Sequence, residues 1–324
     1  MLRESVHDKR PGAVIGNARR YHVRHKLIDR LDFAGGKLLS RVAAGMEVTG
    51  AVELLEPYQR VWMVYDANAA VHAAKVEAAL ADTGKLQGTY SLQAAEETKT
   101  IDTVLAMADW LLAHGADRDA LLLAVGGGIT TDMAGFAAAV YKRGIRFAFI
   151  PTTLLSQVDA AIGGKTGVNF HSLKNMLGVI RQPEFTYICP DVLATLPERD
   201  FRSGAAEMLK TFIIEDNGNY SKAVSLLGGL AGGRSIADCS EELMTLIAEA
   251  AKVKAGVVSR DQFESGERRK LNLGHTFAHA IEWKARETGS DITHGEAVAI
   301  GVIQAARLTD SALAERLRSD FAAA

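Results

Sequence analysis

The chain has 324 residues, enough for two domains and a large buried core. Its hydrophobic content of 48%, its 23% of charged residues and its formal net charge of −2 are ordinary for a soluble protein. This charge does not point to a nucleic-acid or membrane partner. The two distant cysteines, Cys189 and Cys239, argue against a disulfide framework. With no apolar run of about 18 residues and no secretory signal, we expect a cytoplasmic protein.

The first half of the chain alternates between two kinds of segment. Residues 1–50 stay unassigned, and we interpret their basic start as a solvated extension. Strand patterns follow at 61–67, 87–93, 121–128, 147–153 and 185–191, with helical patterns between them at 70–81, 98–114 and 131–141. This alternation predicts an α/β domain over 51–190, with a parallel sheet covered on both faces and ligands at the carboxyl ends of the strands.

After Pro190 the strand signal stops. Apolar residues recur at spacings of three and four over 204–216, 241–258, 272–287 and 295–320. These patterns predict that residues 191–324 form a second, all-helical domain.

Two glycine-rich stretches in the first half could bind anions. In LLLAVGGGITTD a buried strand runs into Gly126, Gly127 and Gly128, but Thr131 stands where a dinucleotide fingerprint has its third glycine. The stretch is therefore either a nucleotide site or a tight turn. GGKT at 163–166 is not a P-loop, because Asp159 stands where that motif needs glycine, and Lys165 is either a surface lysine or an anion ligand.

Three potential metal ligands occur in the second half. Glu207 lies in GAAEMLK, His275 in LNLGHTFAHAIE and His294 in HGEAVAIG. One carboxylate and two imidazoles suit Zn²⁺ with a position left open for substrate, as in catalytic sites. His279 is one helical turn after His275, so it could ligate as well, contact substrate, or be structural.

Basic residues recur at glycine-rich or loop positions, which suggests a substrate carrying phosphate and carboxylate groups. They are Arg143, Lys165, Lys174, Lys210, Lys254 and Arg268. Spacing alone does not show whether they converge.

Together these motifs resemble those of the 3-dehydroquinate synthase family of sugar-phosphate cyclases. The resemblance runs from about Val64 to Val302 and rests on LLLAVGGGITTDMAGFAAAVYKRGIRFAFIPTTLLSQVDAAIGGKTGVN, KNMLG, TLPERDFRSGAAEMLK, LNLGHTFAHAIE and HGEAVAIG, in family order. It implies a Rossmann-like NAD-binding α/β domain followed by a helical metal-binding domain, and a homodimer.

The resemblance also implies a role for particular residues. Zn²⁺, or Co²⁺ in its place, would be held by Glu207, His275 and His294. NAD would contact Asp66, Asn68, Glu96, Lys99, Gly127, Gly128, Asp132, Thr152, Thr153 and Thr195. The substrate pocket would consist of Arg143, Asp159, Lys165, Lys174, Asn175, Lys210, Lys254, Arg268, Asn272 and His279.

The implied reaction converts 3-deoxy-arabino-heptulosonate 7-phosphate, a small phosphorylated sugar acid, to 3-dehydroquinate and phosphate in the shikimate pathway. NAD⁺ would be reduced and re-oxidised within each turnover, and the metal would polarise the vicinal hydroxyls. We expect His279 and Asn272 to form hydrogen bonds around the phosphate and the reacting hydroxyls.

Two departures from the family pattern stand out. Thr131 replaces a glycine, which would be awkward if that position needed a positive φ. The family also continues for several dozen residues after the HGEAVAIG helix and supplies a further lysine, whereas this chain ends at Ala324 in a helical pattern. We therefore expect exposed apolar surface, lower stability and lower activity than in a full-length homologue.

Three other functions stay open. The first is a cyclase that acts on a different sugar phosphate, and the second is a metal- and NAD-dependent polyol dehydrogenase, which would not need so many cations. The third is an inactive remnant that still binds nucleotide or serves as an oligomer subunit.

Overall fold

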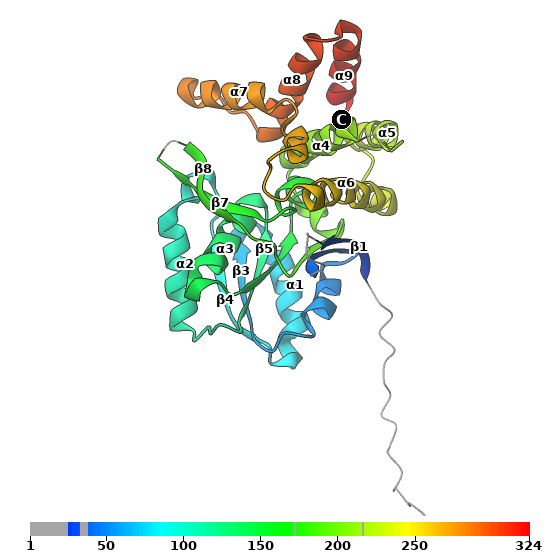
Figure 1. Ribbon diagram of the computed structural model, residues 1–324. Helices are drawn as coiled ribbons and strands as arrows, with labels where there is room; N and C mark the ends of the chain where they lie inside the picture. The colour runs from blue at the N-terminus through cyan, green and yellow to red at the C-terminus, as the bar shows by residue number, and fades with distance from the viewer. Residues whose placement is uncertain (1–24, 33–37, 172, 216) are drawn as a thin grey trace, which may run out of the picture.

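The computed structural model describes residues 25–32, 38–171, 173–215 and 217–324. Residues 1–24 of the basic stretch interpreted as a solvated extension lie outside these residues, whereas its last part, residues 25–32, forms a strand. Figure 1 shows a sheet region with α1 and α2 on opposite sides, and a group of helices from α4 to α9 above it. Among the described residues, no helix is both long and apolar enough to cross a bilayer.

Seven of the described strands form one sheet, in the order β1-β2-β9-β6-β5-β3-β4. They are β1 (His25–Asp32), β2 (Leu38–Gly45), β3 (Val61–Asp66), β4 (Leu86–Leu92), β5 (Leu121–Gly126), β6 (Arg146–Pro151) and β9 (Phe185–Ile188). β1 runs antiparallel to β2, and the other neighbours in the sheet are parallel. The carboxyl ends of the parallel strands therefore lie along one edge, where open α/β sheets bind ligands.

Helices cover both faces of this sheet, as the alternation predicted. Successive residues of a strand point to opposite faces, and Met63 packs in a core with α1 (Ala70–Leu80). Its neighbour Trp62 packs in a second core with α2 (Ile101–Ala113) and α3 (Gly128–Val140). The central strands are buried on both sides, which explains the continuous apolar run LLLAV in β5.

The described chain after β9 is helical, as predicted. Its helices are α4 (Glu198–Ile214), α5 (Tyr220–Ala231), α6 (Ser240–Arg260), α7 (His275–Thr288), α8 (His294–Arg307) and α9 (Ser311–Ala323). α4 is buried along most of its length between α5, α6 and α8. Apolar residues from these helices and from the α1 face of the sheet form one continuous core, so the two regions are packed together.

The sequence patterns missed several elements. β1, β2 and α5 were not predicted, and the single helix expected over 295–320 is divided into α8 and α9. Asp310 causes this division, because its side chain accepts hydrogen bonds from the backbone N–H groups of Ala312 and Leu313 and begins a new helix.

A separate hairpin, β7 (Lys165–Phe170) and β8 (Leu173–Ile180), was also missed. Much of β8 is exposed, so apolar alternation is weak. The hairpin begins after Gly163 and Gly164, whose φ angles of +102° and +69° favour glycine. GGKT is thus a turn into a hairpin that lies beside the helical region (Figure 1).

Candidate active site

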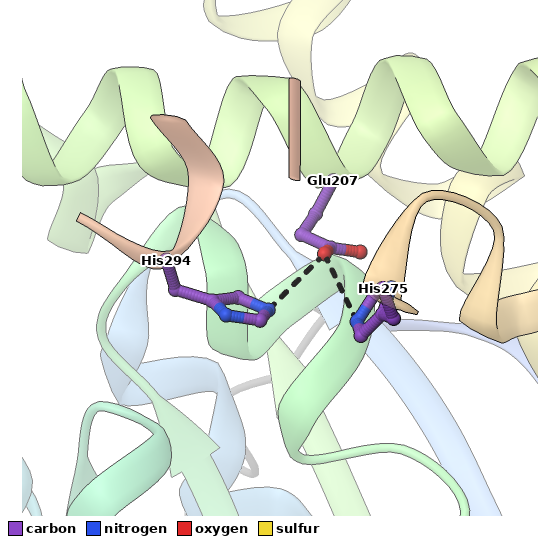
Figure 2. Close-up of side chains that lie close together, drawn as sticks. All are labelled: Glu207, His275 and His294. Atoms are coloured by element: carbon purple, nitrogen blue, oxygen red, sulfur yellow. Dashed lines mark ion pairs between the residues drawn. The ribbon is translucent and has the colours of Figure 1, made fainter. Parts of the chain in front are cut away.

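Three side chains from three helices meet where the helical region faces the sheet. Glu207 lies on α4, and His275 and His294 are the first residues of α7 and α8. Oε1 of Glu207 is 3.4 Å from Nε2 of His294 and 3.9 Å from Nε2 of His275 (Figure 2). Ligands about 2 Å from a tetrahedral Zn²⁺ are roughly 3.4 Å apart, so this spacing fits a metal ion.

Glu207 has the environment of a ligand rather than of a structural carboxylate. It is fully buried, and the charged or polar groups that face its carboxylate are Lys210, His275 and His294. Its ionic partner is Lys210, whose Nζ lies 2.5 Å from Oε2. Burial alone would raise the pKa of Glu207, but the Lys210 ammonium and His294 outweigh it and lower that pKa to about 2. The group is therefore an anion with lone pairs available to a cation.

Each histidine has its other nitrogen against an acceptor. Nδ1 of His275 lies 3.2 Å from the carbonyl oxygen of Leu273, and Nδ1 of His294 lies 3.3 Å from Oε1 of Glu282. Burial lowers the pKa of His275, which favours the neutral imidazole that a metal needs. Burial opposes the charge of His294 as well, but Glu207 and Glu282 outweigh it and raise its pKa to about 9.

Small residues and a capping box bring the three ligands together. Thr293 and Glu296 exchange side-chain-to-backbone hydrogen bonds at the start of α8, which places His294 in its first turn. A Cβ on Gly295 would lie 2.2 Å from the carbonyl oxygen of Ser203, one turn before Glu207 on α4. Only glycine there allows α8 to approach α4 so closely. At the start of α7, Gly274 has a φ of +78°, and its backbone lies against that of Gly301 in α8.

A group of buried charges lies beside the metal ligands. Nζ of Lys254 is 2.5 Å from Oδ1 of Asp159, and Arg268 donates to the carbonyl oxygen of Gly163 at 3.0 Å. Burial lowers the pKa values of Lys254 and Arg268. Burial would raise the pKa of Asp159, but Lys254 and Lys210 hold it well below its usual range. These predicted substrate residues therefore converge in the folded chain.

The loop before α7 contains a carboxylate that the sequence analysis did not single out. Glu264 accepts a hydrogen bond from Nδ2 of Asn272 at 2.6 Å and pairs with Lys165. Glu264 has a φ of +60°. Its loop is held by Asp261, whose carboxylate accepts hydrogen bonds from several backbone N–H groups. Lys165 and Asn272 thus reach the same point from the hairpin and from the helical region. His279 lies next to His275, with ring centroids 5.5 Å apart.

Most of the predicted cofactor residues lie at the carboxyl edge of the sheet. They follow β3, β4, β5, β6 and β9 and comprise Asp66, Asn68, Glu96, Gly127, Gly128, Thr152, Thr153 and Thr195. A Cβ on Gly127 would lie 2.9 Å from Cγ2 of Thr153, so this turn needs glycine for space rather than for its φ. Thr195 has its hydroxyl 2.7 Å from Nε2 of the buried His72.

The hairpin connects the cofactor residues with the substrate residues. Nζ of Lys99 lies 2.6 Å from Oδ2 of Asp132 and 2.6 Å from Oδ1 of Asn175 on β8. Lys174, the preceding residue on β8, lies 3.1 Å from Glu282 on α7 and 3.8 Å from Glu96. The residues predicted to bind NAD and those predicted to bind the substrate therefore form one continuous polar site.

One predicted substrate residue stands apart, and one expectation needs correction. Within the single chain, Arg143 lies beyond the far end of α3, about 20 Å of helix from Gly128 and away from the other predicted substrate residues. It lines a surface cavity of about 840 Å³ together with Asp117, Arg118 and Asp119. Thr131 causes no strain, because it lies within α3 without a positive φ and its hydroxyl donates to the carbonyl oxygen of Gly128.

Comparison with known proteins identifies the family. The N-terminal 3-dehydroquinate synthase profile matches residues 89–203 and the C-terminal profile matches residues 204–320. The 3-dehydroquinate synthase of Paracoccus denitrificans is 40% identical over 275 residues, which cover 85% of this chain and 72% of that protein. The chain belongs to the 3-dehydroquinate synthase family.

A further curated relative has the same name, and two similar solved structures contain NAD⁺ and a metal ion. The 3-dehydroquinate synthase of Acidithiobacillus ferrooxidans is 45% identical over 218 residues, so the chain spans 58% of that relative's length. A 2-deoxy-scyllo-inosose synthase complexed with carbaglucose-6-phosphate, NAD⁺ and Co²⁺ is 29% identical, with a TM-score of 0.79 over 90% of this chain and 81% of that one. A 2-epi-5-epi-valiolone synthase from Streptomyces hygroscopicus, with NAD⁺ and Zn²⁺ bound, is 29% identical, with a TM-score of 0.77 over the same shares.

Proposed function

We propose that this chain is a 3-dehydroquinate synthase, which converts 3-deoxy-arabino-heptulosonate 7-phosphate to 3-dehydroquinate and phosphate. The observation that carries the proposal is the pairing of a three-ligand metal site with buried cations. Glu207, His275 and His294 lie next to Lys210 and Lys254 in one polar site at the carboxyl edge of a dinucleotide-type sheet. Family membership and the NAD⁺ and metal in related cyclases support it.

The metal ion, NAD⁺ and the substrate would be bound by different parts of the chain. Glu207, His275 and His294 would hold Zn²⁺ or Co²⁺, and residues 51–190 would provide the NAD⁺ site at the sheet edge. When bound, NAD⁺ supplies a reversible hydride acceptor and the metal supplies a Lewis acid for the substrate hydroxyls. The helical part of the chain, 191–324, would supply most of the metal and substrate contacts.

The cations would hold the anionic groups of the substrate. Lys165, Lys254 and Arg268 would bind phosphate and carboxylate and thereby orient the ring before reaction. Asn272 and His279 would donate hydrogen bonds around the phosphate and the reacting hydroxyls. Glu264 pairs with Lys165 and Asn272, so its carboxylate would give way to the substrate anion.

A polyol dehydrogenase is the second candidate, because it could use the same metal ligands and sheet edge. A neutral substrate needs no cations besides the metal, whereas this site holds the buried Lys254, paired with Asp159, and the buried Arg268. The number of buried cations therefore favours a cyclase acting on a phosphorylated acid. A cyclase for a different sugar phosphate fits these charges equally well.

The test is phosphate release from the heptulosonate 7-phosphate with Zn²⁺ and substoichiometric NAD⁺, while absorbance of NADH is followed. We expect many equivalents of phosphate per NAD⁺ without accumulation of NADH. Accumulating NADH without phosphate would indicate a dehydrogenase instead. Absence of both products, with Zn²⁺ and NAD⁺ demonstrably bound, would refute this substrate and leave another sugar phosphate or an inactive remnant.

A matched pair of variants on α6 tests the role of the buried cations. Lys254→Met removes a buried ammonium and should lower kcat/KM at least about 30-fold, equivalent to ~2 kcal/mol. Lys252→Met removes an exposed charge two residues earlier and should leave kcat/KM unchanged. Equal activities of the two variants would contradict the proposed anion site.

The proposal also includes a homodimer and a cytoplasmic location. Both cysteines are free and buried, which suits a reducing compartment. Sedimentation velocity at micromolar concentration would test the dimer, and a monomer with full activity would remove that part of the proposal.

A further inference from the structure

One face of α7 contains an unexpected buried carboxylate. α7 is largely exposed, and its buried residues are Ala278 and Glu282. Glu282 is only 6% exposed and lies seven residues after His275, so the two side chains share one helix face. A carboxylate is rarely buried unless it has partners, which raises the question of what Glu282 does.

Glu282 contacts two residues of the site through the same oxygen. Its Oε1 lies 3.3 Å from Nδ1 of His294 and 3.1 Å from Nζ of Lys174. Nε2 of His294 lies 3.4 Å from Glu207, so the imidazole is placed between two carboxylates. When a metal ion is bound, an acceptor at Nδ1 keeps the proton on that nitrogen and leaves the lone pair of Nε2 for the ion beside Glu207.

His275 provides an independent parallel. Its Nδ1 lies against the carbonyl oxygen of Leu273, and its Nε2 also faces Glu207. Both histidines therefore present Nε2 to the same point and have an acceptor behind Nδ1. For His275 that acceptor is backbone, which substitution cannot remove. For His294 it is the side chain of Glu282.

We propose that Glu282 is a positioning residue of the metal centre, which holds the Nδ1–H of His294 so that Nε2 faces the ion. This inference rests on the metal site of the proposed function. Outer partners of metal-bound histidines typically contribute 10–100-fold to metal affinity. We therefore expect loss of the Glu282 carboxylate to weaken metal binding by a factor in that range.

Lys174 explains the burial of Glu282 less well than His294 does. Its side chain is 33% exposed and also lies near Glu96, so it is not confined to Glu282. If Glu282 served chiefly to hold the hairpin through Lys174, then Lys174→Met would affect the site as Glu282→Gln does. If Glu282 acts through His294, Lys174→Met should leave metal affinity within about threefold.

The experiment measures the Zn²⁺ dissociation constant of the whole chain by competition with a chromogenic chelator, without NAD⁺ or substrate. Glu282→Gln keeps the size of the side chain and should raise the dissociation constant about 10–100-fold. Glu287→Gln, an exposed change on the same helix, is the matched control and should have no effect. The visible spectrum of the Co²⁺-loaded protein should change for Glu282→Gln alone, since it reports ligand geometry, which a purely structural role would not alter.

The outcomes are distinguishable. If wild-type protein binds no Zn²⁺, the metal site and with it the proposed function fail. If wild-type protein binds Zn²⁺ and Glu282→Gln binds it equally well with an unchanged Co²⁺ spectrum, only the role of Glu282 is refuted. Should the metal-free Glu282→Gln variant fail to fold, Glu282→Asp keeps the charge but shortens the reach to His294. Wild-type affinity in that variant would overturn the proposal, and affinity at least tenfold weaker would support it.

Discussion

Replacing Glu207 by glutamine should destabilise the metal-free protein, because it leaves the buried ammonium of Lys210 without its carboxylate partner. Nζ of Lys210 lies 2.5 Å from the Glu207 carboxylate, and the two side chains are 1% and 0% exposed. Removal of one member of a buried ion pair typically costs about 3–5 kcal/mol. Asp159 is close enough to favour the charge on Lys210, so we expect a loss near the lower end, about 3 kcal/mol.

The double variant separates stability from metal binding. Glu207→Gln with Lys210→Met removes both charges, and exchange of a buried pair for uncharged residues of similar volume is often close to neutral. The double variant should therefore be more stable than Glu207→Gln alone, with a coupling free energy of about 2 kcal/mol. Its metal affinity should stay low, because the carboxylate ligand is still missing.

The assay is urea denaturation of the chelator-treated protein at pH 7, with the free energy of unfolding taken from linear extrapolation. The exposed pair Lys284 and Glu287 on α7 is the control, and its removal should change the free energy by less than about 1 kcal/mol. A loss below about 1 kcal/mol for Glu207→Gln, or additive losses in the double variant, would refute the argument from burial.

Three further predictions follow from the site. Gly295→Ala places a Cβ 2.2 Å from the Ser203 carbonyl oxygen, so it should lower the free energy of unfolding in urea by about 1–3 kcal/mol. It should also weaken Zn²⁺ binding in a chelator titration. Wild-type affinity would contradict the need for close approach of the two helices. The pKa of His294 is raised to about 9 in the metal-free fold, so its stabilising contribution is complete below pH 6.5 and is lost as pH rises through 9. The free energy of unfolding should fall over that range by at most about 3 kcal/mol, and His294→Asn should flatten the profile if this group is responsible. Thr131→Gly should destabilise α3 by about 1–2 kcal/mol through lost helix propensity and a lost buried methyl, and a stabilised variant would indicate strain at this position.

The sequence by itself determined the features that depend on local spacing. The apolar run of β5 and the three-and-four spacing after Pro190 predicted the covered parallel sheet and the helical second half. The residue types of Glu207, His275 and His294 were sufficient to suggest a metal, because the chemistry of a ligand is a property of its side chain. β1, β2 and the β7–β8 hairpin were missed. β1 is an edge strand and much of β8 is exposed, and such strands have little apolar alternation.

Only the tertiary structure decided which residues meet. Glu207 and His275 are 68 positions apart, and their contact depends on the close approach of α4, α7 and α8 that Gly295 and Gly301 allow. Arg143 has the same charge as Lys254, yet within one chain the length of α3 places it away from the other predicted substrate residues. Glu282 is an unremarkable helical glutamate in the sequence, and its burial against His294 exists only in the fold. Periodicity describes neighbours within about one helical turn, whereas a site of this kind is assembled by the path of the whole backbone.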